Sequence, residues 1–375
     1  MKILLAGGGT GGHFYPLIAV ARALKEIAER ERIVEMNLKF ISDDPFDPEM
    51  LREEQIGFLK IPAGKIRRYF SFSNFFDFFK TGWGLIKTLL IVYMNFPDVI
   101  FSNGGYASFP TLFAAKFFRI PVVIHISDTI PGKTGLWASH FAKRISISFA
   151  SSLKFFPESK TALTGNPIRK QVLGGNIDEA QTVFDLEAGI PVILVLGASQ
   201  GAQKINDIIL DSLSELIKDY QIILQTGRNN INEIRGRAKL ILENERFAKR
   251  FHALPFLSEG ELRNASKAAL IVVARASAGM IFEISAWAKP AILVPLSNSA
   301  ENHQRENAYN YARSGAAIVI EEQNLSPHIL ISEIRKLAVN LDRLKGMSQV
   351  AQTFSKIDAA DKIAIEIVKL ALEHA

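Results

Sequence analysis

Residues 3–12 of the chain read ILLAGGGTGG, and residues 193–202 read ILVLGASQGA. Each segment is a short aliphatic run followed by a turn rich in glycine or other small residues, and a stretch with helical spacing comes next. Such a sequence is typical of a buried strand joined tightly to a helix, because glycine adopts backbone conformations that other residues avoid. The two segments predict two domains of similar construction, each opening with a strand, a glycine-rich turn and a helix.

Short runs of β-branched and aliphatic residues alternate with amphipathic segments along the whole chain. The expected strands are Ile3–Ala6, Leu38–Ile41, Val99–Phe101, Val122–His125, Val192–Leu196, Ile222–Gln225, Ala269–Val273, Ala291–Val294 and Ala317–Ile320. Strands that alternate with helices predict parallel sheets, since parallel neighbours need crossover connections. The expected fold class is α/β, with two facing, Rossmann-like, doubly wound domains.

The domain boundary is expected at Thr164-Gly165-Asn166-Pro167, where glycine and proline interrupt the pattern. The first domain would cover residues 1–165 and the second residues 166–349. A last helix, expected near residues 357–373, has an apolar stripe at Ile363, Ile367 and Leu370 that suits packing on either domain. We assign residues from about 350 to 375 to the first domain.

Composition excludes several classes of protein. The chain has 375 residues, 48% of them hydrophobic and 22% charged, which rules out intrinsic disorder and a fibrous architecture. It has no cysteine, so a disulfide scaffold, a thiolate metal site and a cysteine nucleophile are excluded. The net charge of +6 suits anionic partners in general.

Targeting signals are weak. The apolar run at Ile3–Ala6 is too short for the core of a signal peptide, and the stretch from Leu85 to Phe96 is interrupted by Lys87 and Asn95. No uncharged apolar run reaches the length of about 18 residues that a membrane-spanning helix needs. We expect a cytoplasmic protein without a transmembrane segment.

The glycine-rich turns allow two functional interpretations by themselves. Gly7, Gly9 and Gly12 fit the G-x-G-x-x-G pattern of an NAD-dependent oxidoreductase, for which Asp43 or Asp44 would bind the ribose. Residues 197–201 fit the G-x-S-x-G pattern of a serine hydrolase, with Ser199 as nucleophile and His303 or His328 as base. Each pattern explains one of the two turns.

Taken in order, the motifs of the whole chain resemble the MurG family of peptidoglycan N-acetylglucosaminyltransferases, which have the GT-B fold. The matching segments are Gly8-Gly9-Thr10-Gly11-Gly12-His13, Asn103-Gly104-Gly105-Tyr106-Ala107-Ser108-Phe109-Pro110, Thr164-Gly165-Asn166-Pro167-Ile168-Arg169, Gly197 to Gly201, Arg275 to Glu283, and His303-Gln304 with Asn307-Ala308. They lie in both halves of the chain, and their combination is specific although no single motif is.

This resemblance implies a UDP-sugar site mainly on the second domain. Ser199 and Arg169 would contact the diphosphate, Leu257 would present its backbone to uracil, and Glu283 would bind the ribose hydroxyls. The helix start formed by Ala278, Gly279, Met280, Ile281 and Phe282 would lie under the phosphates, and Gln304 would reach the sugar. From the first domain, Thr10, Gly11, Gly12 and Asp128 would complete the donor site. Both a diol-binding carboxylate and a helix N-terminus suit a nucleotide chemically.

The resemblance places the lipid acceptor on the first domain, beside Gly104, Gly105 and Tyr106. His13 would be the general base, because imidazole titrates close to neutral pH and the residue follows the first glycine-rich turn. No cofactor is expected. Asp43, Asp44 and Asp47 are typical of a turn rather than of a metal site, so we expect activity in the presence of EDTA.

Two departures from the family pattern bear on specificity. Where the family usually has His-Glu-x-Asn, this chain has His125-Ile126-Ser127-Asp128, and a carboxylate accepts hydrogen bonds but cannot donate them as an amide does. Ser277, Gly279 and Met280 stand where glycine, a bulky apolar residue and threonine are common. These departures concern the residues that would select the donor sugar and place the acceptor.

An aromatic segment precedes the second half of the first domain. Eight of the residues from Tyr69 to Trp83 are aromatic, and Phe72, Phe75, Phe76, Phe79 and Trp83 follow helical spacing. With Lys65, Arg67, Arg68, Lys80 and Lys87 nearby, the segment predicts a helix on an anionic membrane surface. A core helix or a protein interface is the alternative.

The sequence thus predicts an inverting transferase, peripheral on the cytoplasmic face of the membrane. It would move N-acetylglucosamine from UDP to the muramoyl 4-hydroxyl of an undecaprenyl-pyrophosphoryl acceptor, without a nucleic-acid partner. The alternatives are a related GT-B transferase for another UDP-sugar or lipid acceptor, the oxidoreductase, the hydrolase, and a sugar-nucleotide-binding protein without turnover.

Overall fold

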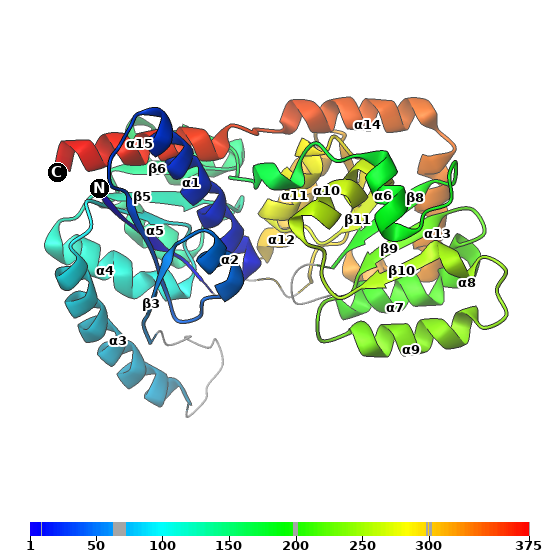
Figure 1. Ribbon diagram of the computed structural model, residues 1–375, viewed down its shortest axis with the longest axis horizontal. Helices are drawn as coiled ribbons and strands as arrows, with labels where there is room; N and C mark the ends of the chain where they lie inside the picture. The colour runs from blue at the N-terminus through cyan, green and yellow to red at the C-terminus, as the bar shows by residue number, and fades with distance from the viewer. Residues whose placement is uncertain (9, 63–72, 198–201, 298, 300–301, 375) are drawn as a thin grey trace. The chain divides into compact units, whose positions relative to one another are not determined.

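The computed structural model describes residues 1–8, 10–62, 73–197, 202–297, 299 and 302–374, and for residues 73–81 the backbone alone. Contacts divide the chain into two compact units (Figure 1). Unit 1 contains Met1–Arg169 and Lys356–Ala375, and unit 2 contains Lys170–Ser355. The division follows Arg169 rather than residue 165, and the returning segment begins at Lys356 rather than near residue 350.

Unit 1 has a sheet of seven strands in the order β3-β2-β1-β4-β5-β6-β7, all of them parallel. The strands are β1 (Lys2–Ala6), β2 (Asn37–Ser42), β3 (Gly57–Lys60), β4 (Val99–Ser102), β5 (Val122–Ile126), β6 (Arg144–Ile147) and β7 (Thr161–Leu163). The helices are α1 (Gly11–Arg30), α2 (Pro48–Glu53), α3 (Ser73–Asn95), α4 (Phe109–Phe118), α5 (Lys133–Ser139) and α15 (Ala359–His374).

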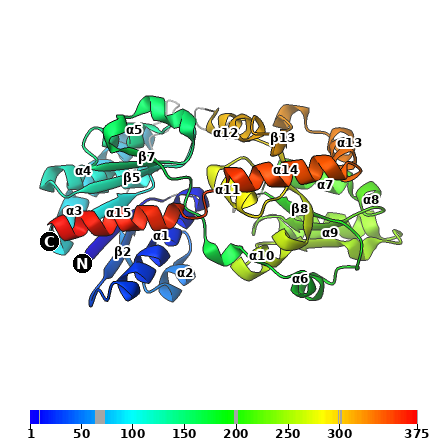
Figure 2. The same cartoon turned by 90° about the horizontal axis from the view of Figure 1, so that it is seen from above.

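Helices cover both faces of this sheet, because its side chains alternate between two cores. Ile3 and Leu5 of β1 pack in the core that α1 and α15 share, whereas Leu4 and Ala6 pack on the side of α4 and α5. The stripe at Ile363, Ile367 and Leu370 lies in the first of these cores. The last helix therefore returns to unit 1, where α15 lies along α1 (Figure 2).

Unit 2 has a six-stranded parallel sheet in the order β10-β9-β8-β11-β12-β13. The strands are β8 (Val192–Leu196), β9 (Gln221–Gln225), β10 (Phe251–Leu254), β11 (Ala269–Ala274), β12 (Ala291–Leu293) and β13 (Ala317–Val319). The helices are α6 (Ile177–Phe184), α7 (Gln203–Asp211), α8 (Leu213–Leu216), α9 (Ile231–Leu242), α10 (Glu259–Ala268), α11 (Ala278–Ala286), α12 (His303–Ala312), α13 (Pro327–Ala338) and α14 (Leu341–Phe354).

Both sheets have the doubly wound strand order of Rossmann folds, so the predicted fold class is confirmed. The order reverses between β1 and β4 in unit 1, and between β8 and β11 in unit 2. Ligands of such sheets bind at the carboxyl ends of the strands beside this reversal. In unit 1 the loops at that position lead to His13 and to Asn103–Tyr106, and in unit 2 the loop after β11 leads to α11.

All nine expected strands are present, and four strands were not predicted. The missed strands are β3, β6, β7 and β10, each of three or four residues. Three of them are edge strands, and none of the residues of those three is fully buried. An edge strand needs less apolar sequence than a central one, which explains why hydrophobic patterning did not reveal β3, β7 and β10.

Candidate functional site

His13 lies in the first turn of α1 and is half-buried. Its Nδ1 atom lies 2.9 Å from the backbone oxygen of Asn103, which follows β4. A carbonyl oxygen only accepts hydrogen bonds, so Nδ1 donates here and the neutral imidazole carries its lone pair on Nε2. This is the protonation state that a general base requires, and it places the proton-accepting nitrogen on the side of the ring away from Asn103.

The loop after β4 brings its glycines against this imidazole. Gly104 and Gly105 have φ angles of +73° and +83°, which favour glycine. A Cβ atom at Gly105 would lie 3.3 Å from His13 Cδ2 and 3.2 Å from the Gly8 oxygen. The backbone of residue 105 therefore forms one wall beside the His13 ring, and a side chain there would crowd it.

Tyr106 begins the short 3-10 helix Tyr106–Ser108 after these glycines. Its hydroxyl donates to Asp43 Oδ2 at 2.5 Å, and burial together with the Asp43 carboxylate raises the tyrosine pKa. Of the predicted acceptor-side residues, Gly105 lies beside the His13 ring, Gly104 precedes it in the same loop, and Tyr106 bonds to Asp43 at the end of β2. Asp44 accepts from the backbone N–H of Phe46 within a turn, whereas Asp47 caps the N-terminus of α2 by accepting from the Met50 N–H.

Asp128 lies in the loop after β5 and is half-buried. Ser152 Oγ donates to its backbone oxygen at 3.2 Å. His125, three residues earlier, is fully buried among Ser146, Ser148 and Asn166. Burial lowers the pKa of His125 to about 4, so this imidazole is neutral at physiological pH.

Arg169 is the last residue of unit 1, although the sequence prediction assigned it to the second domain. Only 5% of the residue is exposed, and its guanidinium carbon lies 4.0 Å from the centre of the Tyr15 ring, close enough for a cation–π interaction. The predicted diphosphate ligand is therefore packed beside the first turns of α1.

In unit 2, α11 begins at Ala278 after Ser277, whose Oγ accepts from the Met280 N–H at 3.4 Å. Ile281 and Phe282 are buried, and Phe282 packs against Phe354 of α14 with ring centres 5.3 Å apart. The side chains of these two residues therefore stabilise the unit, and an anion at this helix start would have to be bound by backbone N–H groups of the first turn. Glu283 follows them and is buried.

Leu257 and Gln304 each take part in a hydrogen bond within unit 2. The Leu257 N–H donates to Gln225 Oε1 at 3.1 Å, and the Leu296 N–H donates to Gln304 Oε1 at 3.1 Å. Sequence reasoning missed Gln225, whose side chain accepts a hydrogen bond from the N–H of Leu257, the residue whose backbone is expected to face uracil. Its position at the end of β9 was the available signal. Ser199 lies outside the described residues, and so does Gly9.

Arg275 precedes α11 and is fixed from two sides. It donates to the Val294 oxygen at 3.3 Å and pairs with Glu322 at 2.5 Å. Burial raises the pKa of the Glu322 carboxyl, but the hydrogen bonds from Arg275 and Ser297 outweigh it and lower the pKa overall. This ion pair holds the segment that leads into α11.

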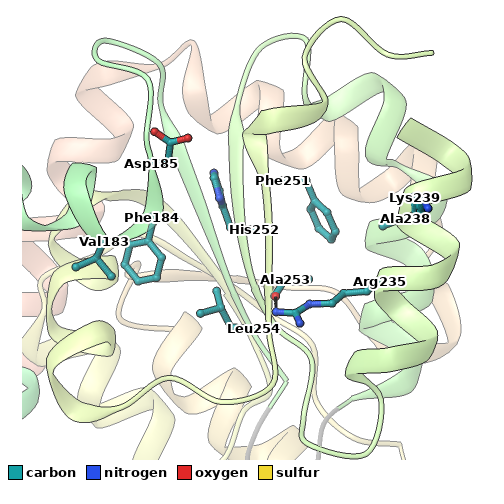
Figure 3. Close-up of a pocket in the computed structure, with 10 residues that line it drawn as sticks. All are labelled: Val183, Phe184, Asp185, Arg235, Ala238, Lys239, Phe251, His252, Ala253 and Leu254. Atoms are coloured by element: carbon teal, nitrogen blue, oxygen red, sulfur yellow. Dashed lines mark hydrogen bonds between the residues drawn. The ribbon is translucent and has the colours of Figure 1, made fainter. Parts of the chain in front are cut away.

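A separate hollow of about 470 Å³ lies at the β10 edge of unit 2 (Figure 3). It is lined by Val183, Phe184, Asp185, Arg235, Ala238, Lys239, Phe251, His252, Ala253 and Leu254. Arg235 donates to the Ala253 oxygen at 3.0 Å and so covers part of the open strand edge. None of the residues predicted to bind substrate lines this hollow.

Helix α3 has an apolar exposed face in its described half. Trp83, Ile86, Leu90, Tyr93 and Met94 are between 54% and 82% exposed, whereas Val92 and Thr88 on the opposite face are buried. Of the predicted membrane contacts, Trp83 is exposed, Phe72 lies outside the described residues, and the side chains of Phe75, Phe76 and Phe79 are not described. The exposed face continues three to eleven residues beyond Trp83, where the segment that the sequence singled out ends.

Two features are absent from the described part of the chain. None of its helices combines the length and the apolar character needed to cross a bilayer. Within the same residues, no three His, Asp or Glu side chains are grouped so as to hold a metal ion.

Both halves of the chain match domains of one enzyme class. Residues 3–147 match the glycosyltransferase family 28 N-terminal domain, and residues 192–363 match the C-terminal domain of that family. Together with the two doubly wound sheets, these matches define a glycosyltransferase of the GT-B fold. Among curated proteins, the chain is 35% identical over 93% of its length to the UDP-N-acetylglucosamine--N-acetylmuramyl-(pentapeptide) pyrophosphoryl-undecaprenol N-acetylglucosamine transferase of Treponema denticola, of which 92% is covered. The chain belongs to this transferase family, the MurG family.

Other relatives agree with this membership. The transferase of the same name from Clostridium perfringens is 33% identical, with 98% of both chains covered. Among solved structures, MurG of Acinetobacter baumannii has a TM-score of 0.73 at 22% identity, covering 98% of this chain and 99% of that one. The S. aureus MnaA–UDP structure has a TM-score of 0.69 at 14% identity, covering 100% and 98%. The oxidoreductase and hydrolase interpretations of the glycine-rich turns are therefore wrong.

Proposed function

We propose that this protein transfers N-acetylglucosamine from UDP-N-acetylglucosamine to the 4-hydroxyl of the muramoyl sugar in an undecaprenyl-pyrophosphoryl-linked acceptor. The observation that carries this proposal is the 35% identity to a transferase named for that reaction, spread over more than nine tenths of both chains. Gly105, one of the predicted acceptor-side residues, lies beside the His13 ring, which is consistent with it.

In this mechanism, unit 2 holds the donor and unit 1 supplies the base. His13 Nε2 takes the proton of the acceptor hydroxyl while that oxygen bonds to the anomeric carbon. The bond from the anomeric carbon to the β-phosphate oxygen breaks, and UDP leaves with the electron pair, so the configuration inverts. Backbone N–H groups of the first turn of α11 would stabilise the charge on the leaving diphosphate, and Glu283 would bind the ribose hydroxyls.

The remaining donor contacts are proposed by resemblance. Ser199 and Arg169 would reach the diphosphate, Leu257 the uracil, and Gln304 the sugar, with Thr10, Gly11, Gly12 and Asp128 contributing from unit 1. Gln225 would have to release the Leu257 N–H if that group is to bind uracil, since one N–H donates one strong hydrogen bond. No metal ion or other cofactor is needed by these groups.

We also propose that the protein binds the cytoplasmic face of an anionic membrane through α3. A lipid-linked acceptor requires access to the bilayer, and α3 presents the exposed apolar side chains of Trp83, Ile86, Leu90 and Met94. Lys87 on the same helix and Arg119 after α4 are exposed near this face and suit anionic headgroups.

The test is transfer from a panel of UDP-sugars, with and without the lipid acceptor, read by mass spectrometry of the lipid product. We expect addition of one N-acetylhexosamine, with UDP-N-acetylglucosamine preferred over UDP-glucose and UDP-galactose. Preferential use of another UDP-sugar would instead show that the donor specificity has changed, and we would attribute that change to Asp128. UDP binding without release in any combination would favour a sugar-nucleotide-binding protein.

A further inference from the structure

Every polar atom of Asn103 takes part in a hydrogen bond. Its backbone N–H donates to the Ala6 oxygen at 3.1 Å, and its backbone oxygen accepts from His13 Nδ1. Its side-chain Nδ2 lies 3.2 Å from the Gly12 oxygen and 3.1 Å from the His13 oxygen, and Oδ1 accepts from Ser127 Oγ at 2.9 Å. Only 2% of the residue is exposed. A buried, fully hydrogen-bonded amide has a single favourable orientation.

The sequence of α1 explains why a donor is needed at this place. In an α-helix the N–H of residue 16 would bond to the oxygen of residue 12, but residue 16 is proline and has no N–H. The Gly12 carbonyl therefore lacks its regular helical donor, and Asn103 Nδ2 supplies one from β4. The same nitrogen bonds the next carbonyl, that of His13. Asn103 thus fixes the backbone of the histidine as well as its ring.

Ser127 sets the orientation of this amide. Because its hydroxyl donates to Oδ1, the Nδ2 atom must face the two carbonyls of α1, and the reversed amide would place an oxygen against them. Ser127 also precedes Asp128 in the loop after β5. Through Asn103, the loop that carries Asp128 and the turn that carries His13 are held in one hydrogen-bonded unit.

We propose that Asn103 is the positioning residue of the catalytic histidine. It acts through His13, holding the ring as the Nδ1–H tautomer, and it couples that ring to the Ser127–Asp128 loop. The inference rests on the proposed role of His13 as base, but its structural part, the tautomer and its dependence on the Asn103 side chain, can be measured without turnover.

The experiment compares Asn103→Asp, Asn103→Ala and Ser127→Ala with the unchanged enzyme. Asn103→Asp keeps the shape but places a carboxylate oxygen against the Gly12 and His13 carbonyls. Asn206→Ala is the matched control, because Asn206 is also a buried asparagine, bonded to the Thr226 oxygen at 3.0 Å in unit 2. The readouts are 15N NMR of labelled histidine, kcat and KM for transfer, and UDP affinity by calorimetry.

We expect His13 of the unchanged protein to be the Nδ1–H tautomer, and Asn103→Asp to shift that equilibrium and lower kcat about 100-fold while UDP affinity stays the same. Ser127→Ala should have a smaller effect in the same direction, and Asn206→Ala should leave the His13 signals unchanged. An Nε2–H tautomer in the unchanged protein would overturn the proposal, as would Asn103 variants with unaltered tautomer and kcat. If Asn103→Asp does not fold, the Asn103→Ala and Ser127→Ala variants test the proposal in its place. If the unchanged protein transfers no sugar, the proposed function is wrong. The NMR measurement would still show whether the His13 tautomer depends on the Asn103 side chain.

Discussion

Two histidines of unit 1 lie in opposite environments. His13 is half-buried and donates from Nδ1 to a backbone oxygen, whereas His125 is only 1% exposed and bonds to two serines and an asparagine. Burial lowers the pKa of His125 to about 4, because the charged imidazolium would lose its hydration. His125 is therefore a structural hydrogen-bonding group, whereas His13 is the histidine that we propose for proton transfer.

The pKa of His125 predicts how stability depends on pH. The unfolded chain binds a proton near pH 6.5, but the folded chain does so only near pH 4, so stability is lost as the pH falls between these values. From pH 7.5 to pH 5, this one group should cost unit 1 about 2 kcal/mol of unfolding free energy. His125→Gln should remove that part of the pH dependence, measured by hydrogen exchange of the β4 and β5 amides in urea.

Exposed His140 provides the control for this measurement, since His140→Gln removes a histidine from the same unit without changing a buried group. If the unfolding free energies of the wild-type protein and of His125→Gln depend on pH in the same way, the lowered pKa of His125 would be contradicted.

Tyr311 of α12 predicts a stabilising substitution. Its ring is fully buried, edge-on to Phe354 with ring centres 4.8 Å apart, but its hydroxyl has no hydrogen-bond partner among the residues that the structure describes. A buried, unpaired hydroxyl costs free energy, so Tyr311→Phe should raise the stability of unit 2 by about 1 kcal/mol. Tyr309→Phe on the same helix should instead lower it, because the Tyr309 hydroxyl donates to Glu321 at 2.8 Å. Urea unfolding followed at Trp287 compares the two, and a loss of stability in both would refute the prediction.

At the scale of elements, α3 and α15 show that an apolar stripe in the sequence does not by itself determine which side chains are buried. Both have apolar stripes, but α15 buries its stripe against α1, whereas α3 leaves a second apolar face exposed. A helix with two apolar faces can bury only one on a sheet, so the other requires a further partner. The periodicity located the helix near Trp83, but which side chains remain exposed depends on the tertiary packing.

The exposed face of α3 predicts loss of vesicle binding when it is made polar. Changing Ile86, Leu90 and Met94 together to serine should weaken binding to vesicles of mixed neutral and anionic lipid at least about tenfold, since each side chain would lose burial in the interface. The matched control changes three exposed apolar residues of unit 2, namely Val183, Leu240 and Val339, to serine. Equal vesicle sedimentation for both triple variants would show that α3 does not contact the membrane.

At the scale of the molecule, the repeated strand and glycine-rich turn allowed the two doubly wound units to be predicted. The buried central strands follow from continuous aliphatic runs such as residues 192–196. The short edge strands do not, because their residues are mixed. The Asn103 interactions also could not be predicted from spacing, since they join residues about 90 positions apart that meet only when β1, β4 and β5 pair.

The whole enzyme is expected to work without a divalent cation. In the proposed mechanism the departing diphosphate is stabilised by backbone N–H groups and by Arg169, which carry out the charge stabilisation that a metal ion provides in other enzymes. Transfer assayed after dialysis against EDTA should keep its full rate. A rate that disappears and returns on addition of Mg²⁺ or Mn²⁺ would refute this part of the mechanism.

The most direct test of the account is His13→Ala, with single-turnover transfer and UDP calorimetry measured on the same preparation. Because His13 belongs to unit 1 and the donor is proposed to bind mainly to unit 2, the two measurements should separate. We predict a fall in the transfer rate of at least about 100-fold with unchanged UDP affinity, and an unaltered rate in the exposed control His140→Ala. A His13→Ala enzyme that transfers the sugar at the wild-type rate would contradict the account.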